Sequence, residues 1–516
     1  MLLTELIQHS HPETKNHPAL INLKKSLSYQ DFSILIAQLS GFYKKQVGYQ
    51  SRVAFLCANS PELAASFLAL SQLRCISTLI DPELSSSEVL EWIRTTQASH
   101  LVISSEQKQK VTLLLKESQI HLPLIELDSI PTQEYPDTFT PDPDQTPQDT
   151  DPILLIRTQG STGSPRSILF HHRQILAGIQ VIKEAYRLRP VERFFSPLHW
   201  SHPFALTHAL LLPLSLGLTC LLTQNLPLSK LPRFLTSAQV TRIIGTPPFY
   251  FQLLLEQSQS KTIIPSLKSV TVGLGFLSPE LRKTFNLLNV FVCQVYGQAE
   301  ALWTIAMEVC PLEEDKKGQK TEASRGFVGK ALPGVQYKLW DQKGKEIELT
   351  GSAQGALALA GPMIMKGYER LEKESRWALR GEWLHTGDIV KIQKVGTETY
   401  LNFIGRASEF EFSESRLEIL SRIDQTLKNN PDLNDTASFF MKTALGKLLL
   451  ILAAVPHPPV RITEQDLLDY CKTQLPRDMI PQVVVFTDEI PRDRGGNPLY
   501  PQLRAKFSSM RLSTSP

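Results

Sequence analysis

The chain has 516 residues, of which 42% are hydrophobic and 20% charged. This length is typical of one large domain with a smaller one, or of about three domains, and it leaves room for a large core. The formal net charge is only +3, from 54 Lys and Arg against 51 Asp and Glu, so we exclude nucleic-acid binding and a charge-driven membrane role.

The cysteines and the apolar segments indicate where the protein resides. The six cysteines show no paired spacing and lie at Cys57, Cys75, Cys220, Cys293, Cys310 and Cys471. This pattern matches neither a disulfide framework nor a zinc site and favours a reducing cytosol. Residues 1–18 lack the basic and apolar regions of a signal peptide. We therefore expect a cytoplasmic protein.

Short apolar runs alternate with longer helical patterns, which is typical of α/β layering. The first predicted strand covers 52–57, and Ser60-Pro-Glu62 then opens a helix with Ser as N-cap and Pro in the first turn. Residues 131–152 are rich in Pro, Asp, Thr and Gln, which predicts an exposed loop. The apolar run 153–156 predicts a buried strand directly after it.

The same alternation continues through the rest of the chain. The apolar stretch 204–222 is broken by polar residues and proline, so it predicts a buried helix and strand and no integral membrane segment. Further strands are expected at 241–245, 269–272, 290–296, 448–455 and 483–486. Ser278-Pro-Glu280 repeats the helix-start signal, and 416–428 predicts another helix.

The segment Arg157-Thr-Gln-Gly-Ser-Thr-Gly-Ser-Pro-Arg166 holds two glycines, several hydroxyls and a terminal cation in one loop. Glycines let the backbone approach an anion closely, and successive N–H groups and hydroxyls form an anion-binding concavity. A terminal guanidinium suits bidentate phosphate contact. Taken alone, the segment also fits an ordinary solvated loop, and it is not a Walker loop because no Gly-Lys-Ser/Thr ends it.

Three further segments follow this loop along the chain: Tyr296-Gly-Gln-Ala-Glu300, Gly381-Glu-Trp-Leu-His-Thr-Gly-Asp388 and Gly405-Arg406. Together with the loop at 157–166 they resemble the motifs of the adenylate-forming superfamily, which includes acyl-CoA synthetases, luciferase and peptide-synthetase adenylation domains. Weaker matches, among them Val328–Gly334 and Met365-Lys-Gly-Tyr368, extend the resemblance from about residue 20 to about residue 505.

The resemblance implies an α/β fold with two domains. A large N-terminal AMP-binding domain with layered mixed sheets and helices would span 1–405. A small, mobile α+β domain would span 406–516.

The resemblance also implies a role for each matching residue. The phosphates of ATP would lie on the loop, whose contacting residues would be Thr158, Gly160, Ser161, Thr162, Gly163 and Arg166. Thr162 would also act in catalysis, Glu300 would ligate Mg²⁺, and Asp388 would accept the ribose hydroxyls. The adenine and its surroundings would contact Gly275, Tyr296 and Gly297. Arg406 would contact the ribose or a phosphate from the domain junction, and a solvated hinge cation is the alternative for it. Tyr296 as a core tyrosine, and Gly275 as part of a plain turn, stay open as alternatives.

The acid would bind near His202, in Trp200-Ser-His-Pro-Phe204. A packing role for this histidine is an open alternative. Amino-acid-activating relatives place an aspartate in this region, but 201–206 contains no acidic residue. Because an unpaired ammonium in such a pocket is costly, an acyl or aryl acid is favoured over an amino acid.

The chain departs from the family pattern mainly in its C-terminal part. In Pro491–Asn497, Asn497 stands where the family has a catalytic lysine, and Arg492 and Arg494 are the cations that could substitute. Residues 407–415 replace the family's hinge segment, with Ser408 at the hinge position. The nucleotide-binding half is therefore largely intact, and the C-terminal catalytic half is altered.

These observations predict an ATP-dependent acid–thiol ligase. It would use Mg²⁺, form an acyl-adenylate with release of pyrophosphate, and pass the acyl group to CoA or to a phosphopantetheinyl carrier protein. The alternatives are a divergent relative with one half-reaction or none, and an amino-acid:carrier-protein ligase.

Overall fold

The computed structural model describes most of the chain. The described residues are 2–8, 15–158, 165–186, 188, 191–223, 226–308, 327–341, 344–349, 351–395, 398–406, 420, 423–424, 426–427, 430–442, 448–459, 462–476, 479–492 and 498–508.

The N-terminal part is built on a six-stranded sheet whose first five strands run parallel, with the last antiparallel. In spatial order the strands are β6 (Leu124–Glu126), β5 (His100–Ile103), β3 (Arg52–Leu56), β4 (Ile76–Ile80), β7 (Pro152–Thr158) and β8 (Arg166–His171). The strands predicted at 52–57 and 153–156 are thus confirmed, because each apolar run is buried on both sides of this sheet.

Helices cover both faces of the six-stranded sheet. Val53 and Phe55 of β3 pack toward α2 (Tyr29–Gln46) and α3 (Pro61–Gln72). Ala54 and Leu56, which point the other way, pack with α4 (Ser86–Thr96) and α5 (Lys108–Glu117). This alternation places two apolar layers around one strand.

The predicted helix starts are confirmed. Ser60 caps α3, its hydroxyl accepting from the Leu63 N–H, and Ser278 caps α11 (Pro279–Leu287) in the same way from Leu281. In both helices the first residue is proline, whose missing N–H would have had no partner in the first turn.

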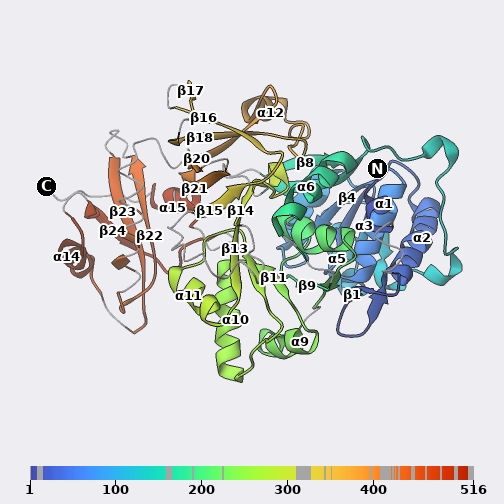
Figure 1. Ribbon diagram of the computed structural model, residues 1–516, viewed down its shortest axis with the longest axis horizontal. Helices are drawn as coiled ribbons and strands as arrows, with labels where there is room; N and C mark the ends of the chain where they lie inside the picture. Colours follow the sequence, from blue (N-terminus) through green and yellow to red (C-terminus); the bar gives the residue numbers. More distant parts are fainter. Residues whose placement is uncertain are drawn as a thin grey trace.

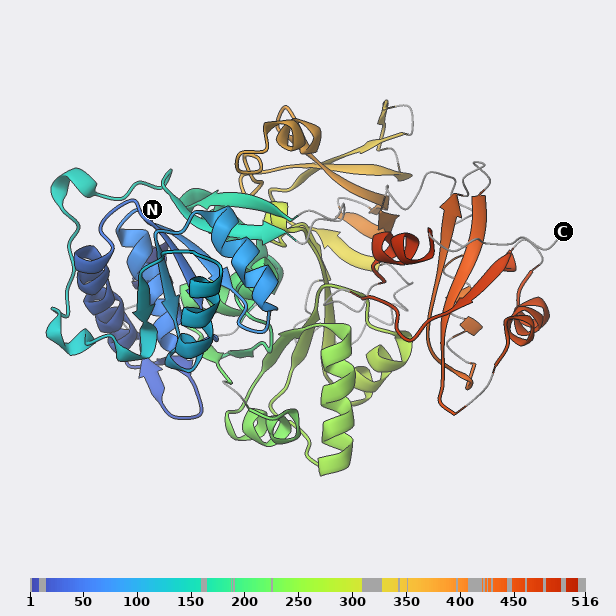
Figure 2. The ribbon, with the colours of Figure 1, turned by 180° about the vertical axis from the view of Figure 1, so that it is seen from behind.

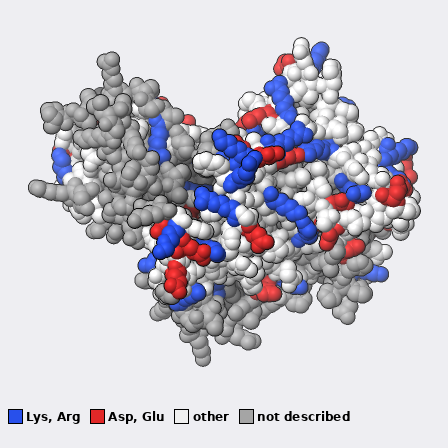
Figure 3. Space-filling model, turned by 90° about the horizontal axis from the view of Figure 1, so that it is seen from above, with Lys and Arg blue, Asp and Glu red and all other residues white. Residues whose placement is uncertain are grey.

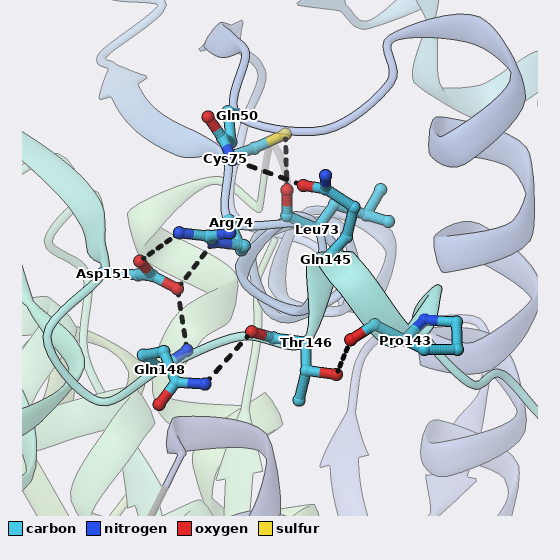
Figure 4. A network of polar contacts seen from close by, with 9 residues as sticks. All are labelled: Gln50, Leu73, Arg74, Cys75, Pro143, Gln145, Thr146, Gln148 and Asp151. Carbon is cyan, nitrogen blue, oxygen red and sulfur yellow. Dashed lines mark hydrogen bonds and ion pairs between the residues drawn. The ribbon is translucent and has the colours of Figure 1, made fainter.

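The expected loop at 131–152 runs along the outside of the N-terminal part, with short 3-10 turns at 132–134 and 143–145. Figure 4 shows how its end is attached: Asp151 receives both Nε (2.9 Å) and Nη2 (3.1 Å) of Arg74, and the Gln148 N–H at 2.7 Å. These hydrogen bonds fix the chain immediately before β7, the strand that leads to the segment 157–166.

The largest sheet has 15 strands among the described residues. One half of it is mainly parallel and the other half is antiparallel. Its parallel half carries the predicted strands at 241–245, 269–272 and 290–296. In order the strands of this half are β13 (Phe291–Tyr296), β12 (Ser269–Val272), β11 (Arg242–Gly245), β9 (Arg193–Phe195), β10 (Thr219–Leu221) and β1 (Pro18–Ile21), and β2 (Ser26–Ser28) closes it antiparallel to β1.

The other half of this sheet is antiparallel and reaches out from β13. Its strands are, in order, β14 (Ala306–Met307), β15 (Phe327–Ala331), β21 (Glu398–Arg406), β20 (Trp383–Val395), β18 (Ser352–Ala360), β16 (Gln336–Trp340) and β17 (Glu346–Ile347), with β19 (Leu379–Arg380) paired to β20. The mixed sheets expected from the sequence are therefore present.

Further helices flank these sheets (Figures 1 and 2). They are α1 (Leu3–Gln8), α6 (His172–Tyr186), α7 (Pro203–Ala205), α8 (Leu212–Ser215), α9 (Leu231–Ser237), α10 (Pro247–Ser260) and α12 (Glu372–Ala378). Between α7 and α8 the backbone is π-helical over Leu206–Leu211. The stretch 204–222 is thus a buried helical segment followed by a strand, as predicted.

A separate three-stranded sheet forms the C-terminal part, at the opposite end of the molecule from the six-stranded sheet (Figure 1). Its order is β22 (Leu433–Lys442), β23 (Leu448–Pro456) and β24 (Val483–Phe486). Alternate residues of β23 pack toward α15 (Tyr500–Ser508) on one face and α14 (Glu464–Gln474) on the other. The predicted strands 448–455 and 483–486 are confirmed. The helix predicted at 416–428 lies largely outside the described residues, and the division at residue 405 stays a prediction.

The structure also bears on the cysteines, on membrane-spanning segments and on the surface charge. Cys57, Cys75, Cys220 and Cys471 are free and buried. Cys293 is disulfide-bonded, a pairing that the spacing of the cysteines along the chain did not indicate. None of the described helices has the length and apolar character needed to span a membrane. Figure 3 shows Lys and Arg interspersed with Asp and Glu on the face seen from above, as the small net charge leads one to expect.

Candidate active site

The candidate site lies where the two halves of the large sheet meet. The parallel strands β11 and β12 end side by side at Gly245 and Val272, and β13 beside them continues to Tyr296. After Tyr296 the chain makes a turn over residues 297–304 and returns as β14. Carboxyl ends of parallel strands are where open α/β sheets bind ligands, and the turn 297–304 carries several of the predicted residues.

Asp388 is the centre of the first group of contacts. It lies on β20 directly opposite Arg406 on β21 in the antiparallel register. Arg406 Nε is 3.0 Å from Asp388 Oδ1, while Oδ2 accepts from the Tyr296 hydroxyl and from Gln298 Nε2, the latter at 2.6 Å. The side chain of Asp388 is 1% exposed. Three predicted residues, Tyr296, Asp388 and Arg406, are therefore brought together.

The carboxylate is held by burial and charge acting in opposite directions. Burial raises the pKa of Asp388 above its usual value, while the guanidinium of Arg406 and the hydrogen bonds from Tyr296 and Gln298 lower it. Burial also raises the pKa of Tyr296 well above its usual value, with Asp388 acting in the same direction. Tyr296 is thus a neutral donor, and Asp388 is a buried acceptor held for contact with hydroxyl or cationic groups.

Gln298 and Thr386 belong to this group although the sequence analysis gave them no role. Gln298 Nε2 also donates to the Thr386 carbonyl at 3.0 Å, and Arg406 Nη1 donates to the same oxygen at 3.2 Å. The Thr386 hydroxyl accepts from the Asp388 N–H at 3.0 Å. Both residues lie inside the motifs quoted above, so their position in the motif was the available signal.

Glu300 is the centre of the second group of contacts, on the same turn. Tyr368 donates its hydroxyl to Glu300 Oε1 at 2.7 Å, and the Met365 N–H donates to the Glu300 carbonyl at 2.8 Å. The Arg166 guanidinium lies 5.0 Å from the centre of the Tyr368 ring. Burial and Glu300 raise the pKa of Tyr368 above its usual value, so this tyrosine is a donor that orients the carboxylate.

The hairpin of β7 and β8 attaches the segment 157–166 to this second group. Thr158 and Arg166 are opposite each other at its end, and the Arg166 N–H is 3.4 Å from the Thr158 hydroxyl. The bridge between Ile168 and Tyr368, with the Glu369 N–H donating to the Ser167 carbonyl at 2.8 Å, fixes the hairpin beside Glu300. Gly160, Ser161, Thr162 and Gly163 lie outside the described residues.

His202 forms a third group with aromatic neighbours. It caps α7, and its ring centre is 5.4 Å from that of Trp303, at the end of the turn 297–304. Trp303 also packs against Phe204, with ring centres 5.3 Å apart. His202 is thus near the same turn as Glu300. Trp303 was missed by the sequence analysis, because nothing local distinguishes it from a core residue.

One predicted glycine explains the shape of the turn 297–304, and a second lies just after β12. A Cβ on Gly297 would lie 2.2 Å from Trp303 Cα, so only glycine fits beneath the turn. Gly275, predicted to lie near the base, follows β12, and its carbonyl accepts from Gln294 Nε2 of β13 at 2.8 Å.

The remaining predicted residues lie in the C-terminal part. Asn497, Arg494 and the segment 407–415 lie outside the described residues. Arg492 is described: its Nε and Nη2 bind both carboxylate oxygens of Asp435, at 2.8 and 2.5 Å, and Nη2 also donates to the Thr436 carbonyl. This guanidinium ties β22 to the segment after β24.

Comparison with known proteins matches this geometry. The model of the family described as AMP-binding enzyme matches residues 7–369. The chain belongs to the AMP-binding enzyme family. The resemblance inferred from the motifs is thereby confirmed.

Full-length relatives of this AMP-binding enzyme are CoA ligases by name. The chain is 25% identical to 4-coumarate–CoA ligase 2 of Nicotiana tabacum, over 96% of this chain and 93% of the relative. It is 22% identical to indoleacetate–CoA ligase of Aromatoleum aromaticum, over 91% of each, and 21% identical to long-chain-fatty-acid–CoA ligase of Escherichia coli O157:H7, over 97% of this chain and 94% of the relative.

Solved structures share the fold of this AMP-binding enzyme. ATP-bound MatB from Rhodopseudomonas palustris superimposes with a TM-score of 0.82 at 19% identity, covering 99% of both chains. The anthranilate CoA ligase AuaEII in complex with anthranoyl-AMP gives 0.80 at 19% identity, covering 98% of this chain and 97% of the other. The predicted α/β fold class is confirmed.

Proposed function

We propose that this AMP-binding enzyme is an ATP-dependent acid–CoA ligase. The acid carboxylate attacks the α-phosphorus of ATP and displaces pyrophosphate, and a thiol then attacks the acyl carbon of the adenylate and releases AMP. The observation that carries the proposal is the buried carboxylate of Asp388, held between Arg406, Tyr296 and Gln298 at the carboxyl end of β13. The CoA ligases named above, which match 91–97% of this chain, support it.

In this proposal Asp388 accepts the two ribose hydroxyls of the nucleotide. An ionised acceptor gives charge-assisted hydrogen bonds, and Arg406 balances its charge at Oδ1, 3.0 Å from Nε. Tyr296 and Gln298 hold the carboxylate in place. The segment 157–166, with Thr158 and Arg166 at its ends, receives the triphosphate next to Glu300.

Mg²⁺ fits the residues beside that segment. The described residues contain no group of three or more His, Cys, Asp or Glu placed to hold a metal. Mg²⁺ is commonly bound by one or two carboxylates plus substrate phosphates, with no full protein cage, and Glu300 supplies such a carboxylate. When bound, Mg²⁺ neutralises charge on the phosphates. Tyr368 orients the Glu300 carboxylate, and Arg166 adds a positive charge beside the phosphates.

The acid would lie against His202 and Trp303. The rings of His202, Phe204 and Trp303 meet at distances of 5.3 to 5.4 Å, and residues 201–206 contain no carboxylate. An aromatic wall without a counter-charge favours an acyl or aryl acid over an amino acid. CoA is the proposed thiol acceptor, and a carrier-protein phosphopantetheine is the alternative.

The C-terminal part bears on how fast the first half-reaction runs. A fixed cation near the α-phosphate stabilises the transition state far better than a neutral amide, and Asn497 is uncharged. Arg492 is already bound to both oxygens of Asp435, which favours a structural role for it. We therefore expect slow adenylation by the natural chain. The rival function is a nucleotide-binding relative that performs one half-reaction or none.

Acid-dependent ATP–pyrophosphate exchange tests the proposal. Fatty, aryl and amino acids are offered separately, followed by CoA with thioester detection. We expect exchange with a fatty or aryl acid and little with amino acids. Asn497→Lys should raise the exchange rate without changing ATP affinity. Asp488→Asn, at an exposed carboxylate in the same part of the chain, is the control and should alter neither. If the natural protein and the Asn497→Lys variant both bind ATP but show no exchange with any acid, the rival function of one half-reaction or none is favoured. A preference for one amino acid would overturn the assignment of an acyl or aryl acid as the substrate.

A further inference from the structure

A buried pair of polar side chains lies behind the candidate acid site and has no role in the proposed chemistry. His208 is 0% exposed, and Tyr186 on α6 is also 0% exposed. The Tyr186 hydroxyl is 2.8 Å from His208 Nδ1, and His208 Nε2 is 2.9 Å from the Trp303 carbonyl oxygen. Buried polar groups are costly unless paired, and these two hydrogen bonds pair both ring nitrogens of His208.

The direction of the two hydrogen bonds follows from the acceptor. A carbonyl only accepts, so Nε2 must carry the proton and donate to the Trp303 oxygen. Nδ1 is then unprotonated and accepts from the Tyr186 hydroxyl. His208 lies in the π-helical segment Leu206–Leu211. Such segments are rare in proteins, and those that do occur frequently lie at functional sites.

The bond partner of His208 is an unusual piece of backbone. Leu302 and Trp303 have φ values of +51° and +61°, which are uncommon for residues other than glycine. Two successive residues in this conformation persist only when the surroundings hold them. Gly297 packs directly beneath Trp303, and the hydrogen bond from His208 holds the Trp303 carbonyl from the other side.

The two ends of the turn 297–304 have separate attachments. Glu300 is held by Met365 and Tyr368. Trp303 is held at its carbonyl by His208, and its ring contacts His202 and Phe204. Loss of the His208 side chain therefore affects the end of the turn at Trp303, where the acid would bind. The hydrogen bonds that hold Glu300, where the metal would bind, stay in place.

We propose that His208 is a positioning residue of the acid site: its Nε2–H holds the Trp303 backbone so that the indole forms the wall that the acid contacts beside His202. The inference rests on the proposed function, because it needs an acid to bind there. It assigns to His208 an effect on acid recognition and none on nucleotide recognition.

The test is the separation of two Michaelis constants in the pyrophosphate-exchange assay. His208→Leu removes the donor, and we expect the KM for the acid to rise about tenfold, because the Trp303 indole is no longer held in the position that the acid contacts. The KM for ATP should stay within about twofold. If His208→Leu does not fold, His208→Phe removes the same donor while keeping the ring contact with Phe204. Equal KM values for the acid in the variant and the natural protein would overturn the proposal.

Tyr186→Phe is the matched control, because it breaks the other hydrogen bond of the same buried pair and leaves the donor to Trp303 in place. We expect it to lower the melting temperature but to keep the acid KM near that of the natural protein. His208→Gln, which retains an N–H donor, should recover most of the acid affinity. An equal rise of the acid KM in Tyr186→Phe would assign His208 to packing alone. Absence of exchange in the natural protein would instead refute the proposed function.

Discussion

At the scale of single residues, Asp388 shows how a buried charge is kept for a ligand. Its carboxylate has partners on both oxygens, yet burial still raises its pKa. A carboxyl group with a raised pKa in the folded state contributes stability at low pH that is lost as the pH rises through that pKa. Ionisation of Asp388 therefore costs the fold stability, and the guanidinium of Arg406 offsets part of that cost.

We predict that Asp388→Asn weakens ATP binding roughly ten- to a hundredfold, because it removes a charge-assisted acceptor. The same change should leave the free energy of unfolding at neutral pH unchanged or raise it, since it removes a buried charge. Isothermal titration calorimetry and thermal unfolding measure the two effects. Glu106→Gln, at an exposed carboxylate, is the control and should alter neither. ATP affinity that is unchanged in Asp388→Asn would refute the ribose assignment.

At the scale of elements, the turn 297–304 connects the three groups of the site. Tyr296 before it contacts Asp388, Glu300 within it contacts Tyr368, and Trp303 near its end contacts His202. The turn is held by the Trp303 N–H donating to the Gln298 carbonyl and the Ile305 N–H to the Tyr296 carbonyl, at 3.0 and 3.3 Å. Its shape therefore fixes the mutual placement of the groups that would bind nucleotide, metal and acid.

Gly297→Ala should disrupt this turn. The added Cβ would lie 2.2 Å from Trp303 Cα, a backbone atom that has no rotamer with which to move away. We expect pyrophosphate exchange to fall more than tenfold with a loss of about 1 to 3 kcal/mol in stability. Gly178→Ala on α6, where the nearest atom is a Leu302 side-chain carbon at 3.4 Å, is the control and should retain activity. Full activity in Gly297→Ala would show that the turn does not position the site.

At the scale of the whole molecule, two fully buried histidines link stability to pH. His172 accepts from the Leu3 N–H at 3.1 Å, and His208 accepts from Tyr186. Burial lowers the pKa of each to about 4, from about 6.5 in an unfolded chain. The unfolded state then binds more protons between these values, so stability is lost as the pH falls from about 6.5 toward 4.

We predict a loss of about 3 kcal/mol per buried histidine over that window. Denaturant unfolding between pH 4 and 7 measures it. His208→Gln should reduce the slope of unfolding free energy against pH by about one proton, which is about 1.4 kcal/mol per pH unit. His100→Gln, at a histidine on β5 that is only partly buried, is the comparison and should change the slope less. A slope identical to that of the natural protein in His208→Gln would contradict a buried neutral His208.

Local sequence was sufficient where a strand is buried on both faces. The runs at 52–57, 153–156 and 483–486 are continuously apolar or nearly so, and β3, β7 and β24 form there. The sequence analysis predicted no strands in the antiparallel half of the large sheet. In β20 buried Val390 and Ile392 alternate with exposed Lys391 and Gln393, and such alternation is a weaker signal than an apolar run.

The order of the motifs by itself determined the family, and the alternation of apolar runs and helical patterns indicated the α/β class. The motifs also predicted Glu300, Asp388 and Arg406 as site residues, because each motif is a short segment whose chemistry is local. Only the tertiary structure decided which of these meet. Asp388 faces Arg406 because of the register of β20 and β21, and it reaches Tyr296 across 92 positions of the chain. His208 reaches Trp303 across 95 positions. Contacts of this kind depend on how strands pair and helices pack, and no local propensity encodes them.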